Sequence, residues 1–289
     1  MKDRIDAVVS IAAQHAAAVD SEAGFPAESF AALREQRLLG IMIPAELGGE
    51  GALISQVADV CYRLGRVCAS TAMIYAMHQI MAACIVRHAG DNVTLREMLR
   101  RMAEDQLLVA SSTTEGQGGG NIRSSEAPLQ CQDGLVSLER NASVISYGAY
   151  ADIILTTARR SGESHGSDQV LVAFWKSEYT LTRLSEWNSM GMRGTCSEGF
   201  ILKAHGKVEQ VIVEPYEIVH PRTMLPTAHV LWGGVWTGVA TGAAARAGFY
   251  PQRGKKEWRA DATGRRRYGP YAGSFAYLTG HSQQRHWRL

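Results

Sequence analysis

The spacing of hydrophobic positions changes twice along the chain and divides it into three parts. Over residues 1–106 the apolar residues recur every three or four positions, as they do on one face of a helix. This spacing predicts helices over residues 3–19, 26–39, 53–66, 70–87 and 93–104. Pro26 is favoured in the first turn of the second helix, and Gly40 ends that helix as a C-cap. Residues 1–106 are therefore predicted to form an all-helical domain.

Residues 107–222 show a different pattern, with short runs rich in Val, Ile, Thr and Leu. Turn signals such as Asp133-Gly134, Ser161-Gly162 and His205-Gly206 separate these runs. Apolar and polar residues alternate over 135–138, as on a strand with one buried face. This part is predicted to be an antiparallel β-domain, either a small barrel or a sandwich, and the chain as a whole an α+β protein.

Helical spacing returns in residues 223–249, which are predicted to be the first helix of a shortened C-terminal helical domain. Gly234, Gly238 and Gly242 recur every four residues, so they share one helix face and allow another helix to approach closely. The same pattern occurs on dimerising membrane helices. The segment stands alone, is only mildly hydrophobic and has Arg246 near its end, which favours a buried helix of a soluble bundle. No membrane partner is predicted.

The pattern is lost in residues 250–289, which carry nine basic residues, two acidic residues and seven aromatics. Their net charge is +7, against −5 for residues 1–249. A shifted reading frame or a degenerate tail explains so abrupt a change best, and a disordered tail is the second interpretation. The third and least favoured interpretation is binding of single-stranded nucleic acid, which also uses basic and aromatic residues. No nucleic-acid partner is predicted.

Composition narrows the class of protein further. The five cysteines form no CxxC pair and no zinc spacing, which predicts reduced thiols and a cytoplasmic location. The histidines are scattered, so no metal site is predicted. Ser111 and Ser112 are not in a GxSxG motif, which argues against a serine hydrolase. Met73, Met77 and Met81 share one helix face and are predicted to pack against the β-domain rather than to form a ligand surface.

The candidate chemistry lies in residues 107–125, LLVASSTTEGQGGGNIRSS. An apolar run leads into four consecutive hydroxyl side chains, Ser111 to Thr114, which can donate and accept hydrogen bonds. Glu115 and a cluster of glycines follow, and glycines let a backbone come close to a ligand. The stretch predicts a strand that ends in a cradle for a polar, planar or phosphorylated group; a flexible hairpin tip is the alternative.

Several motifs, in this order, resemble those of the acyl-CoA dehydrogenase family. They are Pro44-Ala45-Glu46-Leu47-Gly48-Gly49 for the family's proline and double-glycine signature, Thr114-Glu115 with Gly119-Gly120-Asn121 for its TEPxxGSD loop, Val144-Ile145-Ser146-Tyr147-Gly148 for its WITNG segment, and Met190-Gly191-Met192-Arg193-Gly194-Thr195 for its "lGmRgs" segment. Each motif is weak alone, and the order and spacing of all of them over residues 20–249 make the resemblance specific.

The resemblance implies a flavoprotein of fatty acid metabolism with FAD between the β-domain and a C-terminal helical domain. The residues implied in FAD binding are Ser112, Thr113, Thr114, Gly119, Gly120, Ile145 and Ser146. Asn121 and Arg193 are implied in substrate binding, although Arg193 could equally pair with an acid. The implied partners are an acyl-CoA, an electron-accepting flavoprotein or reductase, and further copies of the chain if the C-terminal domain were complete.

The departures from the family pattern are as informative as the matches. The family's Ser-Asp is Gly120-Asn121 here, and its ring-stacking Trp is Val144, which removes an aromatic contact of about 0.5–1.5 kcal/mol. The family's catalytic base is a carboxylate of the C-terminal domain. Glu257 and Asp261 are the only acids beyond Phe249 and lie outside any helical pattern, so no catalytic residue is assigned.

Three hypotheses follow for the activity. The first is an acyl-CoA dehydrogenase-like oxidoreductase acting on the Cα–Cβ bond of CoA thioesters, either active or inactive in this short form. The second is a flavin-dependent monooxygenase of the same fold, which needs no base for an α-proton. The third is a non-catalytic fragment or pseudoenzyme.

Overall fold

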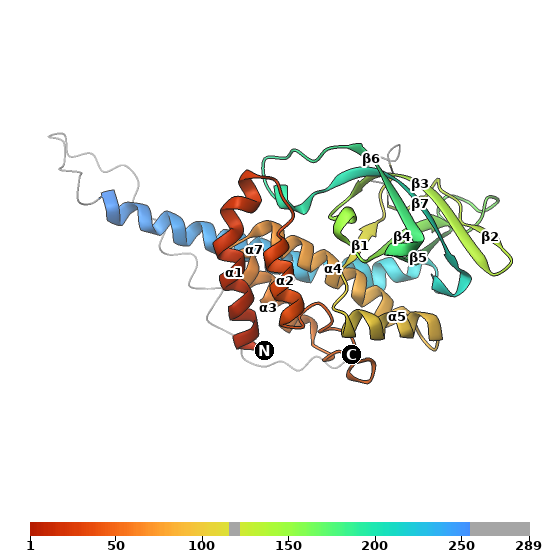
Figure 1. Cartoon of the computed structure of the whole chain (residues 1–289), viewed down its shortest axis with the longest axis horizontal. Helices are drawn as coiled ribbons and strands as arrows, with labels where there is room; N and C mark the ends of the chain where they lie inside the picture. The colour runs from red at the N-terminus through yellow and green to blue at the C-terminus, as the bar shows by residue number, and fades with distance from the viewer. Residues whose placement is uncertain (116–121, 255–289) are drawn as a thin grey trace. The chain divides into compact units, whose positions relative to one another are not determined.

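Helices make up the N-terminal part of the chain. The structure, a computed structural model, describes residues 1–115 and 122–254, and residues 1–245 form the compact unit whose arrangement is given below (Figure 1). The helices of this part are α1 (Lys2–Ser21), α2 (Ala27–Glu35), α3 (Ile54–Gly65), α4 (Ala69–His88) and α5 (Val93–Glu104), with the short turn η1 (Ala45–Leu47) between α2 and α3. The predicted helical N-terminal part is confirmed, but α2 ends at Glu35 with Gln36 as its C-cap, and not at the predicted C-cap Gly40.

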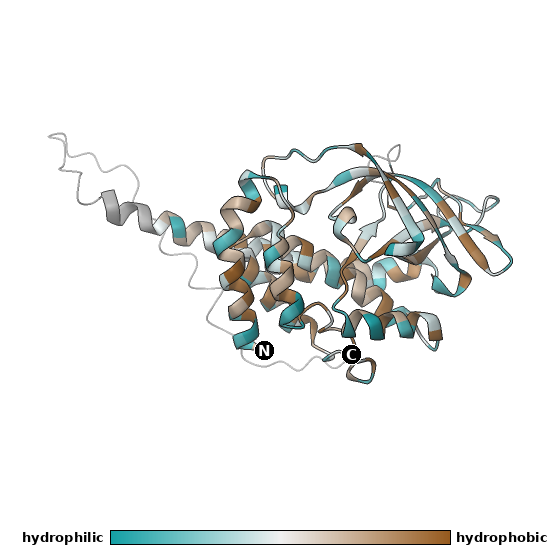
Figure 2. Cartoon of the chain, viewed as in Figure 1, coloured by the Kyte–Doolittle hydropathy of each residue, from teal (hydrophilic) through white to brown (hydrophobic). Residues whose placement is uncertain are grey.

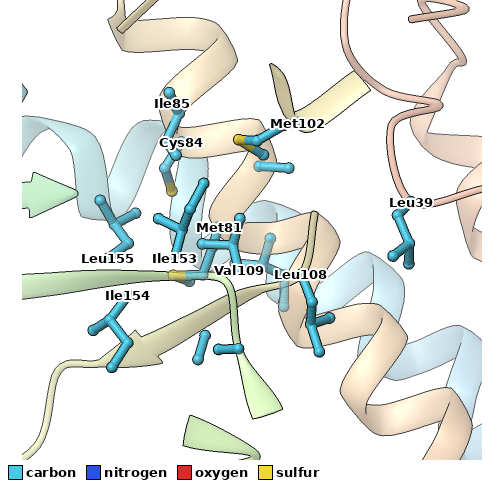
Figure 3. Close-up of a cluster of buried hydrophobic side chains, with 14 of the residues drawn as sticks. Leu39, Met81, Cys84, Ile85, Met102, Leu108, Val109, Ile153, Ile154 and Leu155 are labelled. Atoms are coloured by element: carbon cyan, nitrogen blue, oxygen red, sulfur yellow. The ribbon is translucent and has the colours of Figure 1, made fainter. Parts of the chain in front are cut away.

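Helix α4 is the core of this unit. Its most apolar window has a mean hydropathy of 1.4, enough by length and composition to cross a membrane, but 83% of that window is buried inside the protein. In Figure 3, Met81, Cys84 and Ile85 of α4 lie in one buried cluster with Val109 and Ile153 from the strands. The outer helices α1 and α5 carry both hydrophilic and hydrophobic residues along their length, as expected for helices with one face in water (Figure 2).

Two four-stranded sheets follow the helices. One sheet has the order β1 (Val109–Ser112), β4 (Ile153–Arg159), β5 (Gln169–Trp175), β8 (Val211–Ile212), and the other has the order β2 (Gln130–Gln132), β3 (Leu135–Ile145), β7 (Glu198–Lys207), β6 (Tyr179–Ser185). Strands β4 and β5 are buried along almost their whole length, whereas β3 alternates buried and exposed residues. The first sheet is therefore covered on both faces and the second on one.

One strand pair differs from the predicted antiparallel arrangement. All named pairs within the described residues are antiparallel except β1 and β4, which run parallel with Val109 beside Ile153. Between β1 and β4 the chain passes through β2 and β3 of the other sheet, and so long an excursion allows the chain to re-enter the first sheet in the same direction. The part is a pair of sheets with one parallel contact rather than a purely antiparallel domain.

A buried histidine ties the helices to the strands. His78 in α4 is 1% exposed, and its Nε2 donates to the carbonyl oxygen of Leu39 at 2.9 Å. Its Nδ1 accepts from the backbone N–H of Val109 at 3.0 Å, at the start of β1. Both ring nitrogens are thus satisfied by the neutral ring, and burial lowers the pKa of His78 from 6.5 to about 4.

A half-buried carboxylate makes a second tie between the two parts. Asp152, directly before β4, accepts from the backbone N–H of Leu108 at 2.8 Å. The same oxygen pairs with Arg34 of α2 at 3.2 Å. The entry into β1, the start of β4 and a helix of the N-terminal part are therefore held at one point.

The chain returns to helix in α6 (Tyr216–Val219), η6 (His220–Met224) and α7 (Leu225–Gly254). The glycine face of α7 packs on α3 so closely that an added Cβ would press on backbone carbonyl oxygens: on Ala58 from Gly234, on Tyr62 from Gly238 and on Arg66 from Gly242. Close packing of this face on a neighbouring helix is confirmed. The burial is one-sided, since Trp236 is 53% exposed on the opposite side.

The boundaries of the predicted domains stay predictions. The change from helix to strand falls between Glu104 and Val109, and the change back at Tyr216, so the elements follow the predicted order. The structure describes α7 as far as Gly254, five residues beyond the predicted end of that helix. The tail predicted over residues 250–289 lies outside the described residues from residue 255 onward.

We expect Gly238→Ala to destabilise the protein and Gly233→Ala to stabilise it. The new methyl at 238 would push against the Tyr62 carbonyl, and such overpacking costs about 1–3 kcal/mol. The methyl at 233 meets nothing within 4 Å, so only the better helix propensity of Ala remains, worth up to about 1 kcal/mol. Urea unfolding of both variants measures this; equal effects would contradict the close packing of α7 on α3.

We also expect acid to destabilise the fold through His78. The pKa of His78 is about 4 in the folded protein and 6.5 in the unfolded chain. The contribution of His78 to the free energy of unfolding is therefore complete above pH 6.5 and is lost as the pH falls toward 4. The loss is about 2 kcal/mol at pH 5. His78→Gln removes the titration while offering one donor and one acceptor, so its stability should depend less on pH between 7 and 5.

The matched control for this measurement is His165→Gln, because His165 is exposed. Its free energy of unfolding should fall between pH 7 and 5 as much as that of the unchanged protein. A His78→Gln variant that loses as much stability as His165→Gln over this range would contradict the role given to His78.

Candidate functional site

A cavity of about 340 Å³ lies between α4, the ends of β1 and β3, and the segment from α6 into α7. Its lining residues are Met77, Ile80, Met81, Ser111, Thr113, Thr114, Ile122, Val144, Ser146, Tyr147, Tyr216, His220, Met224, Leu225, Ala228 and Trp232. The volume is at the lower end of the range for small-molecule sites, about 300–1,000 Å³. It suits a ring system better than a whole dinucleotide.

The two sides of the cavity differ in chemistry. The helical side is apolar, with Met77, Ile80 and Met81 from successive turns of α4 and Trp232 from α7. The strand side carries hydroxyl groups from the end of β1 and from the residue after β3. Such a site can hold a flat group that has apolar faces and a polar edge. The faces then contact the apolar side chains, and the edge contacts the hydroxyl groups.

The predicted hydroxyl residues divide between the cavity and the core. Thr113, Thr114 and Ser146, three of the residues implied in cofactor binding, line the cavity. Ser112 and Ile145, which were assigned with them, are 0% exposed and are not lining residues, while Ser111 and Val144 take the positions on the cavity. Successive side chains of a strand point to opposite faces, so only alternate residues can reach the cavity. Matching a motif residue by residue does not take this alternation into account.

The other predicted residues do not meet at this cavity. Gly119, Gly120 and Asn121 lie outside the described residues, so their assignment stays a prediction. Arg193 is in the turn η4 (Arg193–Thr195) and does not line the cavity, and within residues 1–115 and 122–254 no acidic side chain pairs with it. Its Nε is buried without a hydrogen-bond partner in the part of the chain that is described.

The sequence did not identify four residues as part of the cavity wall. Tyr216 and His220 come from α6 and η6, which reach the cavity only through the tertiary fold. Met77 and Met81, predicted only to pack against the β-domain, line the cavity. Their spacing placed them on the face of α4 that points to the strands. No pattern in the local sequence distinguishes a methionine packed in the core from one that lines a cavity.

A second, more polar cavity of about 310 Å³ adjoins the first and shares Ile122, Tyr216 and His220 with it. It also includes Gln169, which is 2% exposed and has a buried Oε1 without a partner among the described residues. Burial, and secondarily the positive charge of Arg123, lowers the pKa of His220. The two cavities together offer an apolar compartment next to a polar one.

Glu115 joins the two ends of the loop that follows the cavity threonines. Its carboxylate accepts from Ser125 Oγ at 2.8 Å and from the backbone N–H groups of Glu126 and Ala127 at 2.6 and 3.3 Å. It also pairs at 3.3 Å with Arg140, which is 1% exposed and whose pKa burial lowers to about 10, with Glu115 acting against this decrease. Glu115 therefore fixes the backbone directly after Thr114.

Comparison with known proteins gives one family and several relatives. The family described as "Acyl-CoA dehydrogenase, N-terminal domain" matches residues 4–107. The chain is 27% identical over 234 residues to cyclohex-1-ene-1-carbonyl-CoA dehydrogenase of Geobacter metallireducens, covering 80% of this chain and 61% of that protein. It is 24% identical over 192 residues to the probable acyl-CoA dehydrogenase YngJ of Bacillus subtilis, covering 66% and 50%. The chain thus spans about half to three-fifths of these relatives.

Two solved structures show the same fold. FMN-bound TdsC from Paenibacillus sp. A11-2 superposes with a TM-score of 0.76 at 18% identity, covering 86% of this chain and 65% of that one. Butyryl-CoA dehydrogenase from Megasphaera elsdenii superposes with a TM-score of 0.76 at 16% identity, covering 91% and 70%. The fold is that of both a flavin-bound protein and an acyl-CoA dehydrogenase.

We expect Glu115→Gln to destabilise the protein by about 3–5 kcal/mol, because it leaves the charge of Arg140 buried without its counter-charge. The control is Glu139→Gln, which breaks an exposed pair with Lys203 and should cost at most about 1 kcal/mol. Adding Arg140→Met to Glu115→Gln should restore much of the loss. Urea unfolding compares the three; similar values for Glu115→Gln and Glu139→Gln would contradict the anchoring role.

Proposed function

Because the chain belongs to the acyl-CoA dehydrogenase family, we propose that its cavity holds the ring of a flavin and that the chain is the flavin-facing part of an oxidoreductase. The single observation that carries the proposal is the pairing of an apolar α4 wall with a row of hydroxyls at the strand ends. A flavin ring has flat apolar faces and a polar edge, which these two walls can satisfy together. When bound, it supplies the electron-transfer chemistry, and the protein supplies position and electrostatics.

We propose FAD as the cofactor and keep FMN as the alternative. Thr113, Thr114 and Ser146 would hold the polar edge of the ring, and Gly119 and Gly120 the diphosphate end of FAD. FMN is supported by the FMN-bound state of TdsC, which shares the fold. The first cavity alone accommodates a ring, so the remainder of either cofactor would extend beyond it.

For the reaction we propose oxidation of a CoA thioester at its Cα–Cβ bond, in fatty acid metabolism. Removal of the α-proton needs a base. None of the described residues that line the first cavity is a carboxylate, so the base would come from outside this lining. Asn121 and Arg193 remain the proposed substrate contacts, although Arg193 lies away from this cavity.

A flavin-dependent monooxygenase is the second candidate. The same absence of a carboxylate from the described lining residues favours it, since this chemistry needs no base for an α-proton. The fold shared with TdsC, a dibenzothiophene monooxygenase, supports it as well. The third candidate is a non-catalytic fragment or pseudoenzyme.

The proposed partners follow from these candidates. An electron-accepting flavoprotein would serve the dehydrogenase and a reductase the monooxygenase, both in the cytoplasm. Leu225, Trp232 and Trp236 leave 38%, 37% and 53% of their surface exposed along α7. Further helices of a C-terminal bundle, or a second copy of the chain in a homo-oligomer, would cover such large apolar side chains.

We expect the purified chain to bind FAD or FMN, with Thr113→Val weakening the binding about fivefold, the effect of one hydrogen bond. Thr180→Val is the control, because Thr180 is exposed on β6 and does not line the cavity. Flavin absorbance and fluorescence titrations measure the affinities. No binding of either flavin would contradict the proposal.

With flavin bound, two anaerobic experiments separate the candidate reactions. Bleaching of the flavin by an acyl-CoA supports the dehydrogenase. Bleaching only by an external reductase, followed by rapid reaction with O₂, supports the monooxygenase. Binding without either response supports the non-catalytic form.

A further inference from the structure

Gln169, at the start of β5, carries a side-chain amide that is buried and only half used. The residue is 2% exposed, and its Nε2 donates to the carbonyl oxygen of Ile122 at 3.2 Å. Its Oε1 is buried and has no hydrogen-bond partner among residues 1–115 and 122–254. A buried acceptor without a partner costs free energy, so this oxygen is suited to receive a donor from a ligand.

The bond to Ile122 also fixes which end of the amide is available. A carbonyl oxygen only accepts, so the NH₂ end of Gln169 must face it. The opposite orientation would set two acceptor oxygens against each other. Gln169 therefore offers an acceptor, and its ligand has to bring an N–H or O–H group.

A third cavity of about 160 Å³ adjoins the second cavity at Gln169. Its lining residues are Ser167, Asp168, Gln169, Pro215 and Glu217. Three of them, Ser167, Gln169 and Glu217, also line the second cavity, so the two cavities meet at these side chains. The junction of the two cavities therefore combines the buried acceptor with groups that are open to water, since Ser167 and Glu217 are exposed.

The charges around this junction favour a cation. Glu217 forms none of the ion pairs found in the described part of the chain, whereas Asp168 is paired with Arg160 at 2.9 Å. None of the described residues that line the third cavity is basic. His220 and Arg123 line only the second cavity, and the lowered pKa of His220 keeps its ring neutral at pH 7. The third-cavity side of the junction thus carries acceptors and one negative charge.

We propose that the junction of the second and third cavities binds a primary ammonium group, with Gln169 as its buried acceptor and Glu217 as its counter-charge. An ammonium group has three N–H donors, which match several acceptors around one point. Its contact with water through the open side limits the cost of desolvating the charge. The site goes beyond the proposed flavin function, because it lies outside the lining of the first cavity and needs no flavin.

Three probes with the same phenyl ring test the chemistry of the site at pH 7. Benzylamine carries a cationic donor, benzyl alcohol a neutral donor and benzoate an anionic acceptor. The protein should bind benzylamine about tenfold more tightly than benzyl alcohol, because a hydrogen bond to a charged group is the stronger one, and benzoate least tightly. Calorimetry measures the dissociation constants. Equal affinities for benzylamine and benzyl alcohol, or no binding of benzylamine, would overturn the proposal.

Two variants assign the roles. Gln169→Met removes the buried acceptor while keeping a side chain of similar length, and should weaken benzylamine about tenfold. Glu217→Gln removes the counter-charge at an exposed position, so it should weaken benzylamine about threefold and leave benzyl alcohol unchanged. The matched controls are Gln132→Met and Glu22→Gln, which change exposed residues outside these cavities and should leave both affinities unchanged.

Urea unfolding of Gln169→Met separates ligand recognition from a purely structural role. If Gln169 served only to hold Ile122, the variant would unfold at lower urea and bind benzylamine and benzyl alcohol in the unchanged ratio. Glu217→Gln keeps the test decisive even if Gln169→Met fails to fold, because its residue is on the surface. An unchanged ratio in Glu217→Gln would overturn the proposal. All measurements are made without flavin, so a failure of flavin binding would contradict the proposed function and leave this result intact.

Discussion

The position of α4 depends on the two hydrogen bonds of one buried imidazole. His78 holds the connection after α2 with one ring nitrogen and the start of β1 with the other. Both bonds use the neutral ring, and a protonated His78 would lose the bond from the N–H of Val109. Met77, beside His78 in the sequence, and Met81, one turn further along α4, line the cavity together with the ends of β1 and β3. The apolar wall of the cavity is a consequence of this tie between helix and strand.

The opposite wall depends on residues that lie behind it. Ser146 is hydrogen-bonded to Ser197, which is hydrogen-bonded in turn to Thr195, so the position of Ser146 on the cavity depends on residues that do not line it. Glu115 acts in a similar indirect way, since it fixes the backbone after Thr114 without lining the cavity. The positions of the wall residues therefore depend on side chains that do not line the cavity.

The sequence allowed the order of elements to be predicted, and it singled out some residues that line the cavity. Helical spacing placed the N-terminal helices, and the repeat from Gly234 to Gly242 identified the face of α7 that packs on α3. The hydroxyl cluster identified Thr113 and Thr114. Contacts between distant segments were not predictable: the parallel pairing of β1 with β4 and the arrival of His220 at the cavity depend on tertiary packing, which leaves no local pattern.

The central claim is that the cavity between α4, the strand ends and α7 holds a flavin ring. The most direct measurement is a crystal structure of the protein grown with FAD or FMN. The account predicts electron density for the ring between Met81 on one side and Thr113 and Ser146 on the other. Density for the ring at any other place on the protein would contradict it.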